Sequence, residues 1–139
     1  MADNKKIVKG LNEALERELG NVIRYLHHSF LVRGVNRGPL VDFFRQKARE
    51  SFEHATALGE KIVALGGHPS IEIPKMKEIG HKSVEEMLGE ELESEKEEVK
   101  EYIKLLRRVE DDIALEFMLK EIIKEEQEGI EDLEKRLRS

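Results

Sequence analysis

The chain carries apolar residues at the spacing of a helix face in four long segments, which short glycine- and proline-containing stretches separate. An α-helix turns once in 3.6 residues, so this period predicts four helices and no sheet. The expected helices span about residues 5–33, 40–65, 83–109 and 112–137. Ser83 with Glu86 three residues later predicts a capping box for the third helix. Asp111 or Asp112 is the expected N-cap of the fourth.

The lengths of the connections predict how the helices are arranged. The first and last connections have only a few residues, so each joins a pair of antiparallel neighbours. The middle connection of about 16 residues reaches roughly 53 Å when extended, whereas a helix of about 25 residues is roughly 38 Å long. It can therefore cross the whole bundle and leave the second and third helices parallel. We expect residues 1–139 to form one all-α, four-helix domain with one long crossover.

Composition excludes several classes of function. The 30 acidic and 24 basic residues give a net charge of -6, and Lys5, Lys6 and Lys9 form the only basic cluster. A nucleic-acid groove is not expected from such a balance. The sequence also lacks a membrane-length apolar run and a signal-peptide core, so we expect a cytoplasmic protein. Because there is no cysteine, any metal ion must be bound by oxygen and imidazole nitrogen.

Three glutamates interrupt the apolar faces of three predicted helices. Glu18, Glu95 and Glu126 each lie midway along a stripe of otherwise apolar residues. Burying an ionised carboxylate without a partner is energetically costly. A single glutamate on an apolar stripe would therefore suggest that the inward face of that helix had been assigned wrongly. Three on three helices indicate a shared partner at the centre of the bundle. A metal cation is the natural candidate, since hard cations prefer oxygen ligands.

The second helix offers the remaining ligands. His54 lies on the flank of its inward stripe, and Glu50 precedes it by four residues, so both side chains can approach one ion. Ser51 lies on the inward stripe itself, whereas Glu53 falls on the outward face as a surface charge. A lone histidine on a helix flank is usually a solvated residue, but three inward glutamates favour a ligand here.

Two tyrosines accompany the carboxylates. Tyr25 and Tyr102 lie one to two turns from Glu18 and Glu95. We interpret them as core aromatics whose hydroxyls bond a carboxylate beside the ligands, because a buried tyrosine hydroxyl needs a partner.

Taken together, these residues resemble the ferritin-like di-iron carboxylate proteins, and in particular the bacterioferritin branch. The stretches that carry the resemblance are Leu11-Asn12 with Glu18 and Tyr25, His54-Ala55 through Leu65-Gly66, Val84 to Leu88 with Glu95, and Glu126 with Ile130 and Leu133.

The resemblance implies a role for each carboxylate. Glu18 would be a terminal ligand of one iron, with His54 as its nitrogen ligand. Glu95 would be the terminal carboxylate of a second iron, and Glu126 would bridge the two. The implied chemistry is oxidation of Fe(II) by O2 or peroxide, in some members followed by mineral storage.

Several positions depart from the family pattern. Ser51 stands where the family has a bridging glutamate, and Gly129 where it has a histidine. Phe52 stands where the bacterioferritins have the methionine that coordinates the haem iron. A phenyl ring cannot coordinate iron, so we expect no haem. The fifth helix of the large shells is absent before Ser139. We therefore expect a homodimer through the first two helices, or a larger homo-oligomer, rather than a hollow cage.

Three hypotheses remain open from the sequence. The first is an iron-binding protein with one or two ions that oxidises Fe(II), although manganese or zinc also suits such ligands. The second is a di-iron enzyme that reduces peroxide or O2 with an external electron donor. The third is a metal-free helical scaffold, in which the buried glutamates are protonated or paired with basic side chains.

Overall fold

The computed structural model describes residues 2–76, 83–109 and 111–138, and every regular element in these ranges is a helix. The helices are α1 (Ala2–Leu31), α2 (Arg37–Ala64), α3 (Val84–Leu106) and α4 (Ile113–Leu137). The prediction of an all-α, four-helix fold is confirmed.

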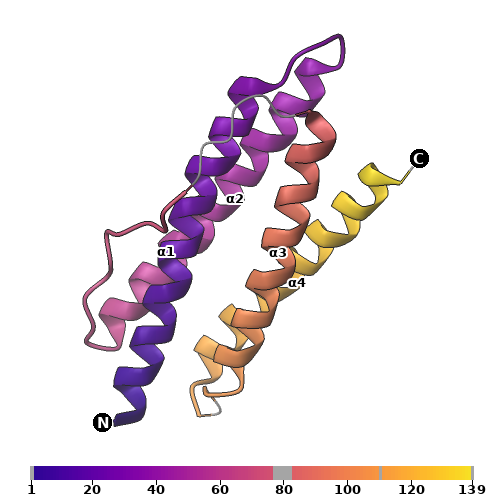
Figure 1. Ribbon diagram of the computed structural model, residues 1–139. Coiled ribbons are helices and arrows are strands. Elements are labelled where there is room, and N and C mark those ends of the chain that lie inside the picture. The colour runs from indigo at the N-terminus through magenta and orange to yellow at the C-terminus, as the bar shows by residue number, and fades with distance from the viewer. Residues whose placement is uncertain (1, 77–82, 110, 139) are drawn as a thin grey trace.

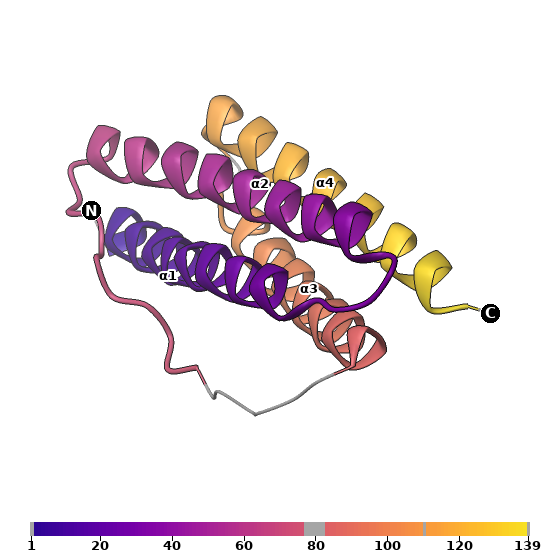
Figure 2. The same cartoon turned by 90° about the horizontal axis from the view of Figure 1, so that it is seen from above.

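The helices form two antiparallel hairpins that lie side by side. Helices α1 and α2 make one hairpin, α3 and α4 the other, with α1 beside α3 and α2 beside α4 (Figures 1 and 2). Helix α2 ends at one end of the bundle and α3 begins at the other, so the two run parallel as predicted (Figure 1). The start of the crossover is fixed to α1, because the Asn12 side chain bonds the His68 carbonyl at 3.0 Å and accepts from the Ser70 amide at 2.8 Å.

The helix ends follow most of the sequence signals. Ser83 and Glu86 form the predicted capping box, and Asp112 rather than Asp111 caps α4 by accepting a hydrogen bond from an amide in its first turn. The chain leaves α2 through Gly66, whose φ of 85° favours glycine. Three boundaries differ from the prediction by three residues: α1 and α2 begin early and α3 ends early. Because α2 begins at Arg37, Pro39 lies inside its first turn. Proline is tolerated there because first-turn amides have no helical acceptor.

The core consists of two apolar clusters with a polar layer between them. One cluster includes Leu11 and Leu58, and the other includes Phe44 and Leu133. On α2, α3 and α4 the buried polar residues fall between the segments that build the two clusters, and on α1 Glu18 and Asn21 do so, whereas His28 and Ser29 lie within the second cluster's segment. The apolar clusters therefore hold a central layer of charged side chains in place, as the interrupted stripes predict.

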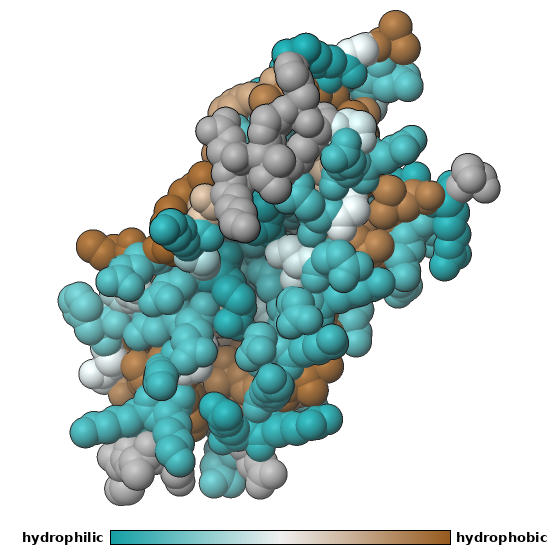
Figure 3. All heavy atoms as spheres, in the orientation of Figure 1, coloured by the Kyte–Doolittle hydropathy of each residue, from teal (hydrophilic) through white to brown (hydrophobic). Residues whose placement is uncertain are grey.

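One face of the bundle is largely polar. Figure 3 shows hydrophilic side chains over much of the face on which α1 and α3 lie. Within the described part of the chain, no helix is both long and apolar enough to serve as a membrane span.

Candidate metal centre

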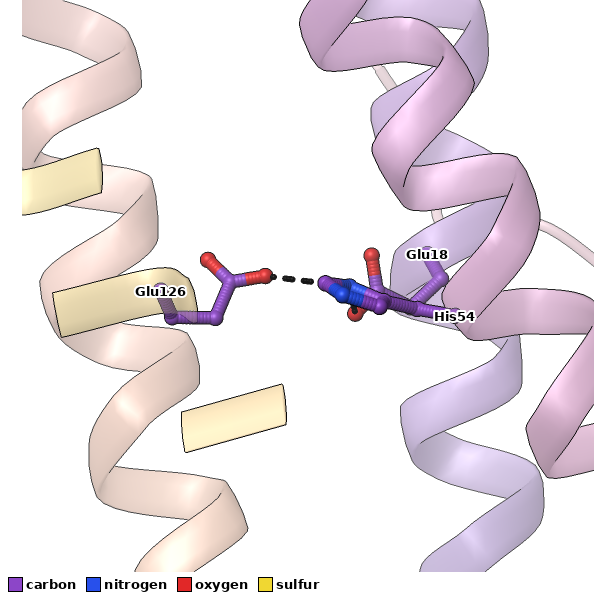
Figure 4. Close-up of side chains that lie close together, drawn as sticks. All are labelled: Glu18, His54 and Glu126. Atoms are coloured by element: carbon purple, nitrogen blue, oxygen red, sulfur yellow. Dashed lines mark hydrogen bonds and ion pairs between the residues drawn. The ribbon is translucent and has the colours of Figure 1, made fainter. Parts of the chain in front are cut away.

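Three helices bring three residues that could bind a metal ion together at the centre of the bundle. Glu18 comes from α1, His54 from α2 and Glu126 from α4, and one donor atom of each lies within 4.8 Å of the others. The Nδ1 atom of His54 is 3.2 Å from Glu18 Oε2 and 3.5 Å from Glu126 Oε1 (Figure 4). All three residues are buried. The structure thus joins three of the five metal ligands that the sequence suggests.

A fourth carboxylate orients the imidazole. The Nε2 atom of His54 lies 2.6 Å from Glu125 Oε2, while Nδ1 faces the two buried glutamates. Carboxylates that accept from the outer nitrogen of a ligating histidine fix its orientation and tautomer. Nδ1 is therefore the nitrogen placed to bind an ion. Sequence reasoning missed Glu125 because it is outside the inward stripe of α4 and its side chain is half exposed.

Glu18, His54 and Glu126 shift one another's pKa values. Burial disfavours the charged imidazole of His54, but the hydrogen bonds with Glu126 and Glu18 prevail and raise its pKa to about 11. Burial raises the pKa of Glu126 to about 7, with the charges of Glu18 and Glu95 acting in the same direction and His54 against it. Without a metal ion, the positively charged His54 imidazolium is consequently the cation that balances the charges of Glu18 and Glu126.

Both predicted tyrosines donate to a carboxylate. The Tyr102 hydroxyl is 2.6 Å from Glu18 Oε2, and the Tyr25 hydroxyl is 2.8 Å from Glu95 Oε1. Burial raises the pKa of both phenols well above the usual value, so both remain protonated donors.

Two suggested ligands lie apart from the other three. Glu95 is buried, but its Oε1 atom lies 2.9 Å from the Nζ atom of Lys47. Glu50 is partly exposed, and its Oε2 atom is 3.5 Å from the same Nζ. Burial opposes the charge of Lys47, yet the Glu95 and Glu50 charges raise its pKa. Lys47 carried no signal in the sequence, because a lysine beside an inward stripe usually reaches solvent.

A second polar network lies between α1 and α3. Arg24 bonds Glu91 at 2.6 Å, and Asn21 bonds Glu98. Burial would raise the pKa of Glu91, but hydrogen bonds from His28 and Arg24 lower it overall. Burial, with nearby negative charges, raises the pKa of Glu98 well above normal. Sequence reasoning missed this network, although Glu91 and Glu98 stand four and three residues from Glu95 and so share its helix face.

The donor set suits a metal cation. Carboxylate oxygens and one imidazole are ligands that iron, manganese and zinc accept. Oε2 of Glu95 and Oε2 of Glu98 are buried without a hydrogen-bond partner. The polar layer therefore has oxygen atoms that could still accept a hydrogen bond or contact a cation. The residues therefore fit the iron that the family resemblance implies. The prediction that haem is absent stays a prediction; Phe52 lies on α2 with 62% of its surface exposed.

An acidic groove of about 550 Å³ leads toward this layer between α2 and α4. Lys47 and Gly129 line it beside the ligands. Its carboxylates are Asp42, Glu50, Glu125, Glu128 and Asp132. Such a lining raises the local concentration of cations.

Comparisons with solved structures support the fold. A crystal structure of ferritin-like, diiron-carboxylate proteins from Bacillus anthracis str. Ames is 32% identical, with a TM-score of 0.93 and 99% of each chain covered. The bacterioferritin of Desulfovibrio desulfuricans is 22% identical, with a TM-score of 0.90 over 98% of this chain and 80% of that one. A Dps protein from Bacillus brevis is 20% identical, with a TM-score of 0.93 and 99% of each chain covered. The last two similarities establish the fold alone.

Sequence comparisons establish the family. A curated relative, the nutrient stress-induced DNA-binding protein of a Nostoc species, is 30% identical over 73 residues, or 52% of this chain. The match spans only 40% of that relative's length. The profile of the ferritin-like domain, by contrast, matches residues 8–139. Together with the bundle and its buried carboxylate layer, this match shows that the chain belongs to the ferritin-like domain family.

Proposed function

We propose that this protein binds iron between Glu18, His54 and Glu126 and oxidises Fe(II) there, with O2 or peroxide as the electron acceptor. The observation that carries the proposal is the convergence of their three donor atoms within 4.8 Å inside the bundle. When bound, the metal ion would supply the redox chemistry. Similarity to the Bacillus anthracis structure, which is described as one of diiron-carboxylate proteins, supports the choice of iron.

The protein's own side chains would bind and orient the ion. Glu18 and Glu126 would supply carboxylate oxygens, and His54 would supply Nδ1 while Glu125 holds its other nitrogen. The Tyr102 hydroxyl would hold the Glu18 carboxylate in place by donating a hydrogen bond to Oε2. Burial of all three ligands keeps competing water away from the ion.

The experiment combines metal analysis with an oxidation assay. Protein produced in iron-supplemented medium should contain iron, and apo-protein should oxidise added Fe(II) faster than buffer does. Glu18→Gln should abolish both properties. Glu53→Gln, which changes an exposed glutamate next to His54 in sequence, should retain both. Wild-type protein that is iron-free and no faster than buffer would refute the proposal.

A second candidate, a metal-free scaffold, is favoured by the pairing of the buried carboxylates with basic side chains. His54 faces Glu18 and Glu126, and Lys47 faces Glu95. In a scaffold, replacing the three glutamates with Gln should leave stability unchanged or raised. Iron should then leave the melting temperature of the wild-type protein unchanged. In the iron-binding protein, iron should raise that temperature for the wild type and not for the triple variant.

We also infer that residues 1–139 form a single domain that associates with a second copy through α1 and α2. Ile23 and Phe30 on α1 are 45% and 62% exposed and lie seven residues apart, on one side of the helix. Phe52 and Val63 on α2 are 62% and 58% exposed. Large apolar side chains exposed on the surface commonly mark a protein interface when they form a patch, and we infer that these residues form that patch.

A further inference from the structure

Lys47 places a positive charge inside the bundle, next to the metal ligands. Only 11% of its side chain is exposed. Its Nζ atom lies 2.9 Å from Oε1 of the buried Glu95 and 3.5 Å from Oε2 of Glu50, which is nearer the surface. The ammonium thus reaches from the acidic groove to the carboxylate of α3.

Gly129 makes this position available. A Cβ atom at residue 129 would lie 2.6 Å from the Nζ atom of Lys47 and 2.8 Å from Oε2 of Glu95. Both distances are shorter than a van der Waals contact, so a larger residue would force the ammonium or the carboxylate to move. Lys47 can therefore keep this inward position beside Glu95 while residue 129 is a glycine.

The Lys47 charge disfavours a second metal ion beside Glu95. The ammonium lies 2.9 Å from Oε1 of that carboxylate, so a divalent cation bound by Glu95 would lie close to another positive charge. Repulsion between like charges at such a distance is unfavourable in a buried site.

The ligand count leads to the same conclusion. A two-ion bundle takes a Glu-x-x-His pair from each of two helices. In this chain the residues at those positions are Ser51 with His54 and Glu126 with Gly129. Each pair has lost one ligand, and the space beside Gly129 and Glu95 holds an ammonium instead.

We propose that Lys47, admitted by Gly129, is a built-in cation that occupies the place of a second metal ion, so that each chain binds a single ion. This inference rests on the proposed function, because it assumes that Glu18, His54 and Glu126 bind iron. It specifies the stoichiometry of that site and gives Glu95 a role as the partner of Lys47 rather than as a ligand.

Metal counting separates the two proposals. Apo-protein titrated anaerobically with Fe(II), and separately with Mn(II), should bind one equivalent per chain in calorimetry and elemental analysis. Two equivalents would overturn the single-ion inference and leave the proposed function standing. No bound equivalent of either ion would overturn the proposed function, and the inference with it.

A designed variant tests the cause of the stoichiometry. Lys47→Ala combined with Gly129→His removes the ammonium and restores an imidazole, so it should bind two equivalents. The control is Lys61→Ala, which breaks another α2 ion pair, 2.8 Å from Asp112, and should still bind one. A folded double variant that stays at one equivalent would show that Lys47 and Gly129 do not set the count.

A charge-neutral variant keeps the inference testable should that double variant fail to fold. Lys47→Met with Glu95→Gln removes one positive and one negative charge together. If Glu95 is only the partner of the ammonium, the affinity for the single ion should fall by less than about tenfold, or about 1.4 kcal/mol. A larger loss would place Glu95 among the ligands and overturn the inference.

Discussion

Metal binding at this site should release protons, and His54 should contribute one of them. Nδ1 can bind an ion only when the imidazole is neutral, yet its pKa without metal is about 11. At pH 7, losing that proton costs about 5 kcal/mol of binding free energy, since one pKa unit corresponds to about 1.4 kcal/mol. The ion and the proton compete for one site, so raising the pH favours the ion.

The slope of affinity against pH follows from the two raised pKa values. Between pH 8 and 9, only His54 must lose a proton, and affinity should rise about tenfold per pH unit. Below pH 6, Glu126, with a pKa of about 7, must lose one as well. The affinity should then rise about a hundredfold per unit.

Calorimetry can count these protons directly. Mn(II) titrations of apo-protein in two buffers of different ionisation enthalpy should report about one proton released at pH 8 and about 1.5 at pH 7. His68→Gln, which changes an exposed histidine in the crossover, is the matched control and should give the same counts. Binding at pH 8 without proton release would refute the assignment of His54 as a charged group that becomes a ligand.

Two further predictions concern the surroundings of the site, and a third concerns the proposed contact between two copies of the chain. Tyr102→Phe should lower iron affinity about five- to tenfold in titrations while the fold is retained, because one hydrogen bond to Glu18 contributes about 1 kcal/mol; an unchanged affinity would count against this contact. Arg24→Leu should lower the free energy of unfolding in urea by about 3–5 kcal/mol, because Glu91 loses its buried partner, and should leave the iron count unchanged. Phe30→Glu should shift the mass from light scattering from an oligomer to a monomer; an unchanged mass would place the interface elsewhere.

Much of the fold was predictable because its signals are local. The Ser83 capping box and the Asp112 cap depend on residues within one turn, and both appear as expected. Glu18, His54 and Glu126 converge because each interrupts or flanks an apolar stripe that must face the core. Helical periodicity, with the preference of buried carboxylates for a charged partner, was therefore enough to suggest them, together with Glu95 and Glu50.

The parts that escaped prediction depend on contacts between distant helices. Lys47 turns inward beside Glu95, where Gly129 on α4 leaves room for it. Glu125 reaches His54 from an exposed position of α4, so its stripe position gave no indication of the contact. Such features follow from how the two hairpins are packed together, which no local pattern specifies.

A crystal structure of the iron-loaded protein, with anomalous scattering measured at the iron edge, tests the central claim most directly. We expect one iron peak per chain, coordinated by Glu18, Glu126 and Nδ1 of His54, with the Lys47 ammonium still against Glu95. The absence of an iron peak between Glu18, His54 and Glu126 would contradict the claim.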